Sequence, residues 1–203
     1  FSATLPREIR ELADRLLNKP SCIDIEAERP TADGVSQIVH PVDRQKKSKL
    51  LSFLIGSQNW DKALVFTRTK RGADRLTRHL QQDGIRADAI HGDKTQGART
   101  RALADFKRGR IRVLVATDIA ARGLDIEDLP QVVNYELPHV AEDYVHRVGR
   151  TARAGRKGDA VSLVCADESK QLAAIEKLLG ERIEKTIVEG FAPSARVANS
   201  EGG

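Results

Sequence analysis

The chain has 203 residues and carries a formal net charge of +5, with a pI near 9.4. This length allows one domain with a substantial core or two small domains, and the mild basic excess is consistent with a polyanionic partner without requiring one. Its two cysteines, Cys22 and Cys165, are far apart and in no metal-ligand spacing, which speaks against a disulfide scaffold and a metal site. No apolar run approaches the roughly 20 residues of a membrane span, so we expect a cytoplasmic protein without membrane contact.

The chain contains no methionine and starts at Phe1-Ser2-Ala3-Thr4, so we expect a piece of a longer protein. Residues 5–18 carry isoleucine and leucine on one face and charges on the other, which predicts an amphipathic helix. A short strand is predicted at 21–26. The polar stretch 28–34 is predicted to be a loop or linker.

From residue 35 onward, short apolar runs alternate with helical patterns. Apolar runs bounded by turn residues predict buried strands, and periodic apolar positions predict amphipathic helices. This alternation is typical of an α/β fold with a parallel sheet covered by helices on both faces. Strands are predicted at 35–42, 63–66, 86–90, 111–116, 132–135, 160–165 and 183–188, and helices at 44–55, 70–83, 96–107, from 141 onward and at 168–179. The small and polar end, 191–203, is expected to be disordered.

Polar residues gather after three successive strands, where ligands of open parallel sheets usually bind. Each of these strands is followed by hydroxyls or helix-start amides together with an arginine. Helix N-termini and free backbone amides bind phosphates, so a row of such sites could track a sugar–phosphate backbone. The row consists of Thr67, Arg68 and Thr69 after the first strand, His91, Gly92, Asp93, Thr95, Gln96 and Arg99 after the second, and Thr117, Asp118, Arg122, Gly123, Leu124 and Asp125 after the third.

Each of these residues also has a purely structural interpretation. Thr69, Thr95 and Thr117 could be helix caps, and so could the aspartates. Gly92 and Gly123 could serve only tight turns. The interpretation as phosphate contacts depends on the pattern recurring at three strand ends with an arginine at each.

A basic stretch begins directly after His146, where four arginines follow at intervals of three: Arg147, Arg150, Arg153 and Arg156. At helical spacing, His146, Arg150 and Arg153 would share a face, and Asp143 could pair with Arg147. Arg150 and Arg153 have no acid three or four residues away, and like charges at that spacing repel each other. We therefore expect these two guanidinium groups to face an anion such as a phosphate, the alternative being a solvated basic face.

The chain contains no Gly-x-x-x-x-Gly-Lys-Ser/Thr phosphate loop. It therefore lacks the usual cradle for a nucleoside triphosphate and the residues that hold its magnesium. Arg150 and Arg153 could instead donate to a phosphoryl group held by another domain, a role in which an arginine is worth on the order of 10³–10⁵ in rate.

Five motifs in order resemble the C-terminal RecA-like lobe of the DEAD-box ATP-dependent RNA helicases, and among these the bacterial RhlE type. Ser2-Ala3-Thr4 is similar to the motif that closes the N-terminal lobe. The other motifs are 64–69 (LVFTRT), 96–99 (QGAR), 116–125 (ATDIAARGLD) and 146–153 (HRVGRTAR). The resemblance implies that residues 1–34 are the end of the N-terminal lobe and an interlobe linker, and that 35–190 form the helicase C-terminal domain.

The resemblance also implies roles by position. Arg150 and Arg153 would be catalytic arginine fingers that reach ATP, whose Mg²⁺ is held mainly by the other lobe. Gly123 and Asp125 would lie at the nucleotide. Interlobe contacts would come from Ser2, Thr4, His146 and Arg147. RNA contacts would come from Thr67, Arg68, Thr69, His91, Gly92, Gln96, Arg99, Thr117 and Asp118.

The main hypothesis is therefore an enzyme fragment. The parent protein would hydrolyse ATP, close its two lobes around single-stranded RNA and separate short duplexes, while this lobe alone would have no ATPase activity. The family also allows for partners in ribosome assembly or RNA decay. Two alternatives stay open: a stand-alone RNA-binding or partner-docking module, and a DNA helicase or translocase lobe, because no separate reader of the ribose 2′-hydroxyl is identifiable.

Overall fold

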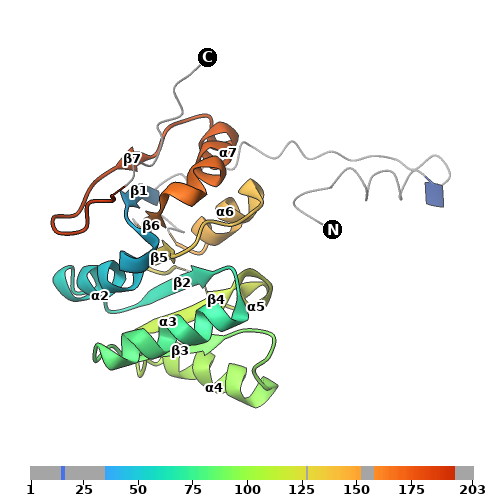
Figure 1. Ribbon diagram of the computed structural model, residues 1–203. Helices are drawn as coiled ribbons and strands as arrows, with labels where there is room; N and C mark the ends of the chain where they lie inside the picture. The colour runs from blue at the N-terminus through green and yellow to red at the C-terminus, as the bar shows by residue number, and fades with distance from the viewer. Residues whose placement is uncertain (1–14, 17–34, 127, 152–157, 195–203) are drawn as a thin grey trace. The chain divides into compact units, whose positions relative to one another are not determined.

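The structure, a computed structural model, describes residues 15–16, 35–126, 128–151 and 158–194 (Figure 1). The chain divides into two compact units, Phe1–Thr31 and Ala32–Gly203. Of the first unit only Arg15 and Leu16 are described, and both are helical and exposed. The rest of the helix predicted at 5–18, the strand at 21–26 and the linker at 28–34 lie outside the described residues.

In the described part of the second unit, seven parallel strands form one sheet. In the order in which they lie side by side they are β3 (Ala87–Ile90), β4 (Val113–Thr117), β2 (Ala63–Thr67), β5 (Gln131–Asn134), β6 (Gly158–Val164), β1 (Val35–Pro41) and β7 (Glu184–Lys185). Every residue of β2 and β4 is buried, as expected for apolar runs in a sheet covered on both faces. The predicted α/β fold with a parallel sheet is confirmed.

Helices cover both faces of this sheet (Figure 1). They are the 3₁₀ helix η1 (Arg44–Lys46), α2 (Lys47–Ser57), α3 (Lys70–Gln82), α4 (Gln96–Lys107), α5 (Asp118–Ala121), α6 (Ala141–Val148), the 3₁₀ helix η2 (Ala166–Glu168) and α7 (Ser169–Leu179). Because neighbouring strand residues point to opposite faces, Val65 packs with Leu50 and Leu76 of α2 and α3, whereas Phe66 packs with Phe106 of α4. A third cluster joins α6 and α7 to β1 and β6. Within the described ranges, no helix has the length and apolar character needed to cross a membrane.

Two helices differ from the prediction. Helix α6 ends just before Gly149, so Arg150 lies beyond it. His146 and Arg150 therefore do not share a helical face, contrary to the prediction from their spacing, and Arg153 lies outside the described residues. The short helix α5, directly after β4, was not predicted, because a single turn carries too little periodicity to be recognised.

The end of the described chain packs against the first part of the domain. Phe191 contacts Phe53 of α2, with ring centroids 5.6 Å apart. Ser194 donates to Asp43 Oδ1 from its amide at 2.9 Å and from its hydroxyl at 2.8 Å, and these bonds lower the pKa of Asp43. Residues 191–194 thus belong to the folded domain, which corrects the expected disorder for this part of 191–203; residues 195–203 lie outside the described residues.

A buried ion pair joins the start of α2 to η2. The side chains of Lys47 and Glu168 are 3% and 1% exposed, and the Lys47 ammonium donates to Glu168 and, at 2.9 Å, to the carbonyl of Tyr135. The Glu168 carboxylate also accepts from the amides of Leu137 and Cys165, both at 3.1 Å. Burial alone would raise the pKa of Glu168, but the Lys47 charge and these hydrogen bonds outweigh it, so this pKa lies below its ordinary value.

Replacing Lys47 with methionine should lower the free energy of unfolding by about 3–5 kcal/mol, because the Glu168 carboxylate stays buried without its counter-charge. The double variant Lys47→Met/Glu168→Gln should recover part of this loss, since it removes the buried charge as well. Urea unfolding of the 203-residue chain, followed by circular dichroism, measures both. A single variant as stable as the unmodified chain would show that the pair does not support the fold.

The same carboxylate should make the domain sensitive to acid. Because the folded-state pKa of Glu168 is lowered, its contribution to stability is complete above about pH 4.5 and is lost as the pH falls through the lowered pKa. The unfolding free energy of Glu168→Gln should therefore change less with pH below 4.5 than that of the unmodified chain. Urea titrations of both chains at neutral pH and on either side of pH 4.5 measure this difference, and identical pH profiles would contradict it.

Candidate functional site

The carboxyl ends of β3, β4 and β2 lie next to one another at one edge of the sheet. Thr67 pairs in register with Thr117, and Ile90 pairs with Ala116, so the segments that follow these strands emerge at the same edge. The structure therefore brings together the three strand ends that the sequence analysis placed in a row.

The threonines of this row are engaged within the domain. Thr67 is fully buried, and its hydroxyl donates to the carbonyl of Thr69 at 3.3 Å. Thr69 and Thr95 cap α3 and α4, each accepting from an amide of the first turn, at 3.0 and 3.3 Å. The structural interpretation thus holds for these two residues. Thr117 makes no such capping bond and is 7% exposed.

The residues that remain accessible to an external anion include two arginines. Arg68 follows β2 and keeps 21% of its side chain exposed. Gly92 and Gln96 are exposed, and the half-buried Arg99 donates to Gln96 Oε1 at 3.3 Å. Guanidinium donors and a glycine backbone at one edge are suited to hold phosphate oxygens.

The loop after β3 is fixed to α3 through one shared carboxylate. His91 is 2% exposed, and its Nε2 lies 3.0 Å from Asp74 Oδ1. Lys94 Nζ lies 3.0 Å from the same oxygen. Burial would raise the pKa of Asp74, but His91 and Lys94 outweigh it and lower this pKa. These contacts hold Gly92 in place and leave the His91 ring little access to an external ligand.

The side chain of Arg147 is buried in the centre of the site, although the sequence analysis assigned it to an interlobe contact and a pair with Asp143. Its Nε and Nη2 donate to the two oxygens of Asp118 at 2.6 and 2.8 Å. Its Nη1 donates to Asn134 Oδ1 at 2.9 Å and to the carbonyl of Glu136 at 2.7 Å. At 1% exposure the guanidinium is engaged inside this domain, which favours a positioning role over the predicted interlobe contact. The Asp118 carboxylate is likewise engaged inside the domain.

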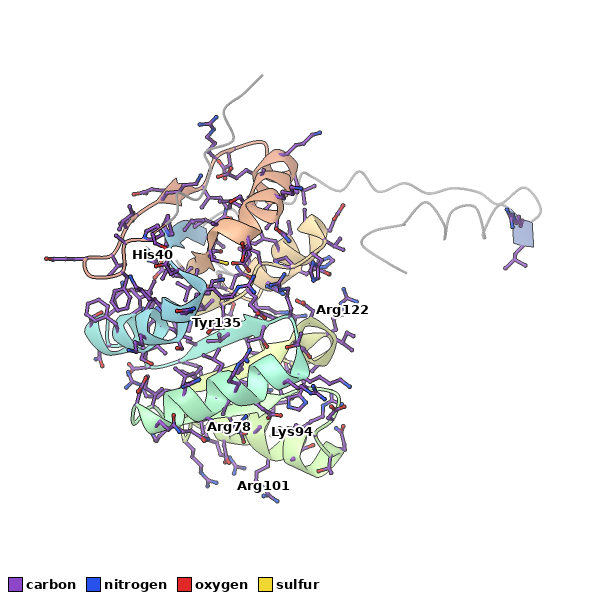
Figure 2. The ribbon with its side chains drawn as sticks, viewed as in Figure 1. His40, Arg78, Lys94, Arg101, Arg122 and Tyr135 are labelled. Carbon is purple, nitrogen blue, oxygen red and sulfur yellow. The ribbon has the colours of Figure 1, made fainter. Side chains whose placement is uncertain are left out.

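The partner of Asp143 is Arg122, which follows α5. Arg122 Nη2 donates to Asp143 Oδ1 at 2.6 Å, and His146 Nδ1 lies 3.8 Å from the same oxygen. Figure 2 shows Arg122 beside α5. His146 keeps 45% of its side chain exposed and so remains available for a contact outside the domain.

Arg150 meets the loop after α5 at one corner of the site. Its Nη1 donates to the carbonyl of Leu124 at 3.3 Å, and this residue lies between Gly123, at φ +73°, and Asp125. Asp125 is 92% exposed and pairs with Lys107 at 2.7 Å, which lowers the pKa of its carboxyl. The structure thus places the predicted nucleotide contacts from 123 to 125 next to Arg150. The other predicted contacts, Ser2, Thr4 and Arg153, lie outside the described residues.

The family model of the helicase conserved C-terminal domain matches residues 45–155, more than half of the chain. The chain belongs to the helicase conserved C-terminal domain family. The matched segment contains the three strand ends, α5, α6 and Arg150, so the geometry described above is that of a helicase domain.

Two relatives of this helicase domain are ATP-dependent RNA helicases. The chain is 43% identical to the ATP-dependent RNA helicase CshA of Listeria monocytogenes over an alignment of 205 residues. This alignment covers 99% of this chain and 39% of the relative. The chain is also 43% identical to the ATP-dependent RNA helicase DbpA of Bacillus subtilis, with 91% of this chain and 39% of the relative covered. The chain therefore spans well under half the length of these relatives. The DEAD-box resemblance is confirmed, whereas these relatives do not single out the RhlE type.

Solved structures share the fold. The Escherichia coli DEAD-box protein SrmB, bound to regulator of ribonuclease activity A, matches with a TM-score of 0.75 and 35% identity, over 81% of this chain and 97% of that chain. Saccharomyces cerevisiae Dbp5, bound to RNA and ADP BeF3, matches with a TM-score of 0.77 and 33% identity, over 95% of this chain and 50% of that chain. The RecA-like helicase C-terminal fold is thereby confirmed.

Two site residues of the helicase domain, Asn134 and Glu136, were missed by the sequence analysis. Both help to hold Arg147, and the Glu136 carboxylate also accepts from the amide of Arg68 at 2.7 Å. The signal that could have found them is their position directly at the end of β5, because the rule that found the other strand ends applies equally there.

Replacing Arg147 with lysine should destabilise the helicase domain by about 3 kcal/mol. A single ammonium group cannot reach all the acceptors on Asp118, Asn134 and Glu136 that the planar guanidinium contacts. Arg150→Lys, three residues away and half-buried, is the matched control and should change the stability little. Urea unfolding of the 203-residue chain compares the two variants. Equal stability of Arg147→Lys and the unmodified chain would rule out the organising role of Arg147.

Proposed function

We propose that this helicase domain is the C-terminal lobe of an ATP-dependent DEAD-box RNA helicase, which hydrolyses ATP and unwinds RNA duplexes. In this proposal Arg150 and Arg153 act on ATP held by the N-terminal lobe. The observation that carries it is the corner at which Arg150 meets residues 123–125. Among the described residues the Arg150 guanidinium makes a single hydrogen bond, at 3.3 Å, so turning it toward an external phosphate costs little.

The sheet edge beside this corner supports binding of an RNA backbone. Arg68, Gln96 and Arg99 offer donors there, together with the exposed backbone of Gly92. Such contacts hold phosphates without reading bases, so we expect binding that is largely independent of sequence. The predicted contacts Thr67, His91, Thr117 and Asp118 are mostly buried or engaged, and we assign them to positioning this edge.

The residues of this domain fit a nucleotide that is bound mainly by another lobe and contacted by this domain on one side. Arg150 and the exposed Asp125 can reach outward, and the ion pair of Asp125 with Lys107 is exposed and weak. The chain has no phosphate loop, and the described part of it contains no group of three His, Cys, Asp or Glu residues that could hold a metal ion. We therefore assign ATP and Mg²⁺ mainly to the N-terminal lobe, with Gly123, Asp125, Arg150 and Arg153 facing the nucleotide and with Ser2, Thr4 and His146 at the lobe interface.

Further properties follow from the same proposal. Residues 1–34 would be the end of the N-terminal lobe and the interlobe linker, and the protein would work in the cytoplasm, where partners in ribosome assembly or RNA decay are found. We place the protein in the RhlE type on its motifs alone, since the similarity to CshA and DbpA supports the DEAD-box group as a whole.

In the full-length parent protein, Arg150→Ala and Arg153→Ala should each lower the RNA-stimulated ATPase rate by a factor on the order of 10³ or more, because each removes a donor that stabilises the transferring phosphoryl group. RNA affinity should be preserved. Steady-state ATPase assays with saturating single-stranded RNA, together with fluorescence anisotropy for RNA binding, measure both quantities.

The control for this experiment is Arg110→Ala, whose side chain is 65% exposed and, within the described part of the chain, forms its ion pair only with Asp105. It should leave the ATPase rate unchanged. Near-normal ATPase rates in both Arg150→Ala and Arg153→Ala would contradict the assignment of these arginines to ATP. ATP turnover by the 203-residue chain alone would contradict the assignment of the nucleotide to the other lobe, and tight RNA binding without that lobe would favour a stand-alone module.

A further inference from the structure

A pocket of about 300 Å³ opens beside the strand ends, on the side of the sheet that α2 and α3 cover. It lies outside all motifs assigned above except at Arg68. Its lining comes from the segments after β2, β5 and β6, from η1, from the first turn of α2, and from α3 between Gly72 and His79. Figure 2 shows Tyr135, one of the lining residues, between α2 and β2. This volume is at the lower end of the range for small-ligand sites.

The pocket has an excess of positive charge. The cations that line it are Arg44, Lys47, Arg68 and Arg75, and the carboxylates are Glu136 and Glu168. Lys47 and Glu168 neutralise each other at its buried end. The remaining three arginines therefore face a single further carboxylate within the lining.

These three arginines keep most of their binding capacity. Arg68 Nη2 lies 4.0 Å from Glu136 and 3.9 Å from Glu168, beyond hydrogen-bond distance. Arg44 pairs with Asp167 at 2.8 Å, but both side chains are more than half exposed, so water and ligands compete for this pair. Arg75 is exposed and makes no ion pair within the described ranges. Burial raises the pKa of Tyr135 to about 12, so its phenol stays a neutral hydrogen-bond donor.

We propose that this pocket binds a phosphate group of the RNA strand, one position beyond the strand-end row. This proposal rests on the proposed function and extends the RNA-binding surface. In the sheet order, β2 stands between β4 and β5, so the row of ends β3, β4, β2 continues directly into the ends of β5 and β6 that line the pocket. Arg68 belongs to both the strand-end row and the pocket lining. Guanidinium groups bind phosphate bidentately, and three of them around one polar pocket match that ligand.

RNA is the occupant that these observations favour over an acidic protein segment. The pocket is continuous with the row that holds Arg68 and Arg99. A single RNA strand that runs along the row would therefore reach the pocket through Arg68, whereas nothing in the row favours a protein segment. Neighbouring strands lie about 4.8 Å apart, so the added strand ends lengthen the basic edge by roughly 10 Å. A free phosphate ion would use the same donors, but it could not produce a loss of RNA affinity that depends on strand length, so RNAs of graded length separate the two sources.

The test uses the full-length parent protein with a non-hydrolysable ATP analogue and single-stranded RNAs of graded length. The variant Arg44→Gln/Arg75→Gln removes two lining charges. The matched control Lys49→Gln/Arg78→Gln removes two exposed charges from α2 and α3 that do not line the pocket. Figure 2 shows Arg78 on α3, away from Tyr135. Fluorescence anisotropy gives the dissociation constant of each RNA at several salt concentrations.

We expect the pocket variant to flatten the dependence of log affinity on log salt by about 0.7 for the lost phosphate contact, and the control to leave it unchanged. The loss should appear with long strands and vanish once the strand is too short to reach the pocket. Equal losses at all lengths, or equal losses in variant and control, would overturn the proposal. Unchanged RNA affinity of the pocket variant would also overturn the proposal. That holds even if Arg44 and Arg75 were then found to bind inorganic phosphate or an acidic peptide.

The two proposals fail in different ways. If the pocket does not bind RNA, the unmodified parent still shows RNA-stimulated ATPase activity that depends on Arg150. If the parent is not an RNA helicase, the unmodified protein shows no such stimulation.

Discussion

The buried guanidinium of Arg147 is the constraint on which the site depends. It is always charged and presents five donors in a rigid plane, so its burial requires acceptors in fixed places. Asp118, Asn134 and Glu136 supply them from the start of α5, the end of β5 and the segment after β5. The bidentate pair with Asp118 ties α5 to α6, so the loop after α5 and the residues after α6 leave from fixed positions. The corner at which Arg150 sits is a consequence of this one buried charge.

Glu136 connects that corner to the basic pocket. Its carbonyl accepts from Arg147 at 2.7 Å, and its carboxylate accepts from the amide of Arg68 at 2.7 Å. The parallel sheet makes this contact unavoidable, because β2 and β5 are neighbours and the residues after them emerge side by side. The surface assigned to ATP and the surface assigned to RNA are therefore two sides of one rigid edge. A shift of the segment after β5 would move both.

Most of the fold could be predicted because strands buried on both faces are continuous apolar runs, and the predicted bounds of β1 to β6 agree with the structure within two residues. The strand-end rule likewise located Arg68 and Arg99, since topology alone brings those ends together. Side-chain partners were beyond reach. Local spacing paired Arg147 with Asp143, four residues away, but the structure pairs it with Asp118, because tertiary contacts override helical neighbours once a charge is buried.

Two arginines three residues apart in one basic motif have opposite environments, because α6 ends between them. On a continuous helix their side chains would share a face. The helix instead stops before Gly149, so Arg147 stays in the last turn with every guanidinium nitrogen bonded inside the domain. Arg150 follows the turn, and its guanidinium makes one hydrogen bond to the described residues, at 3.3 Å. The repeat of arginines in the sequence therefore conceals a division of roles. Arg147 neutralises the half-buried carboxylate of Asp118 and fixes the site, and Arg150 retains donors of the kind that an external phosphate requires.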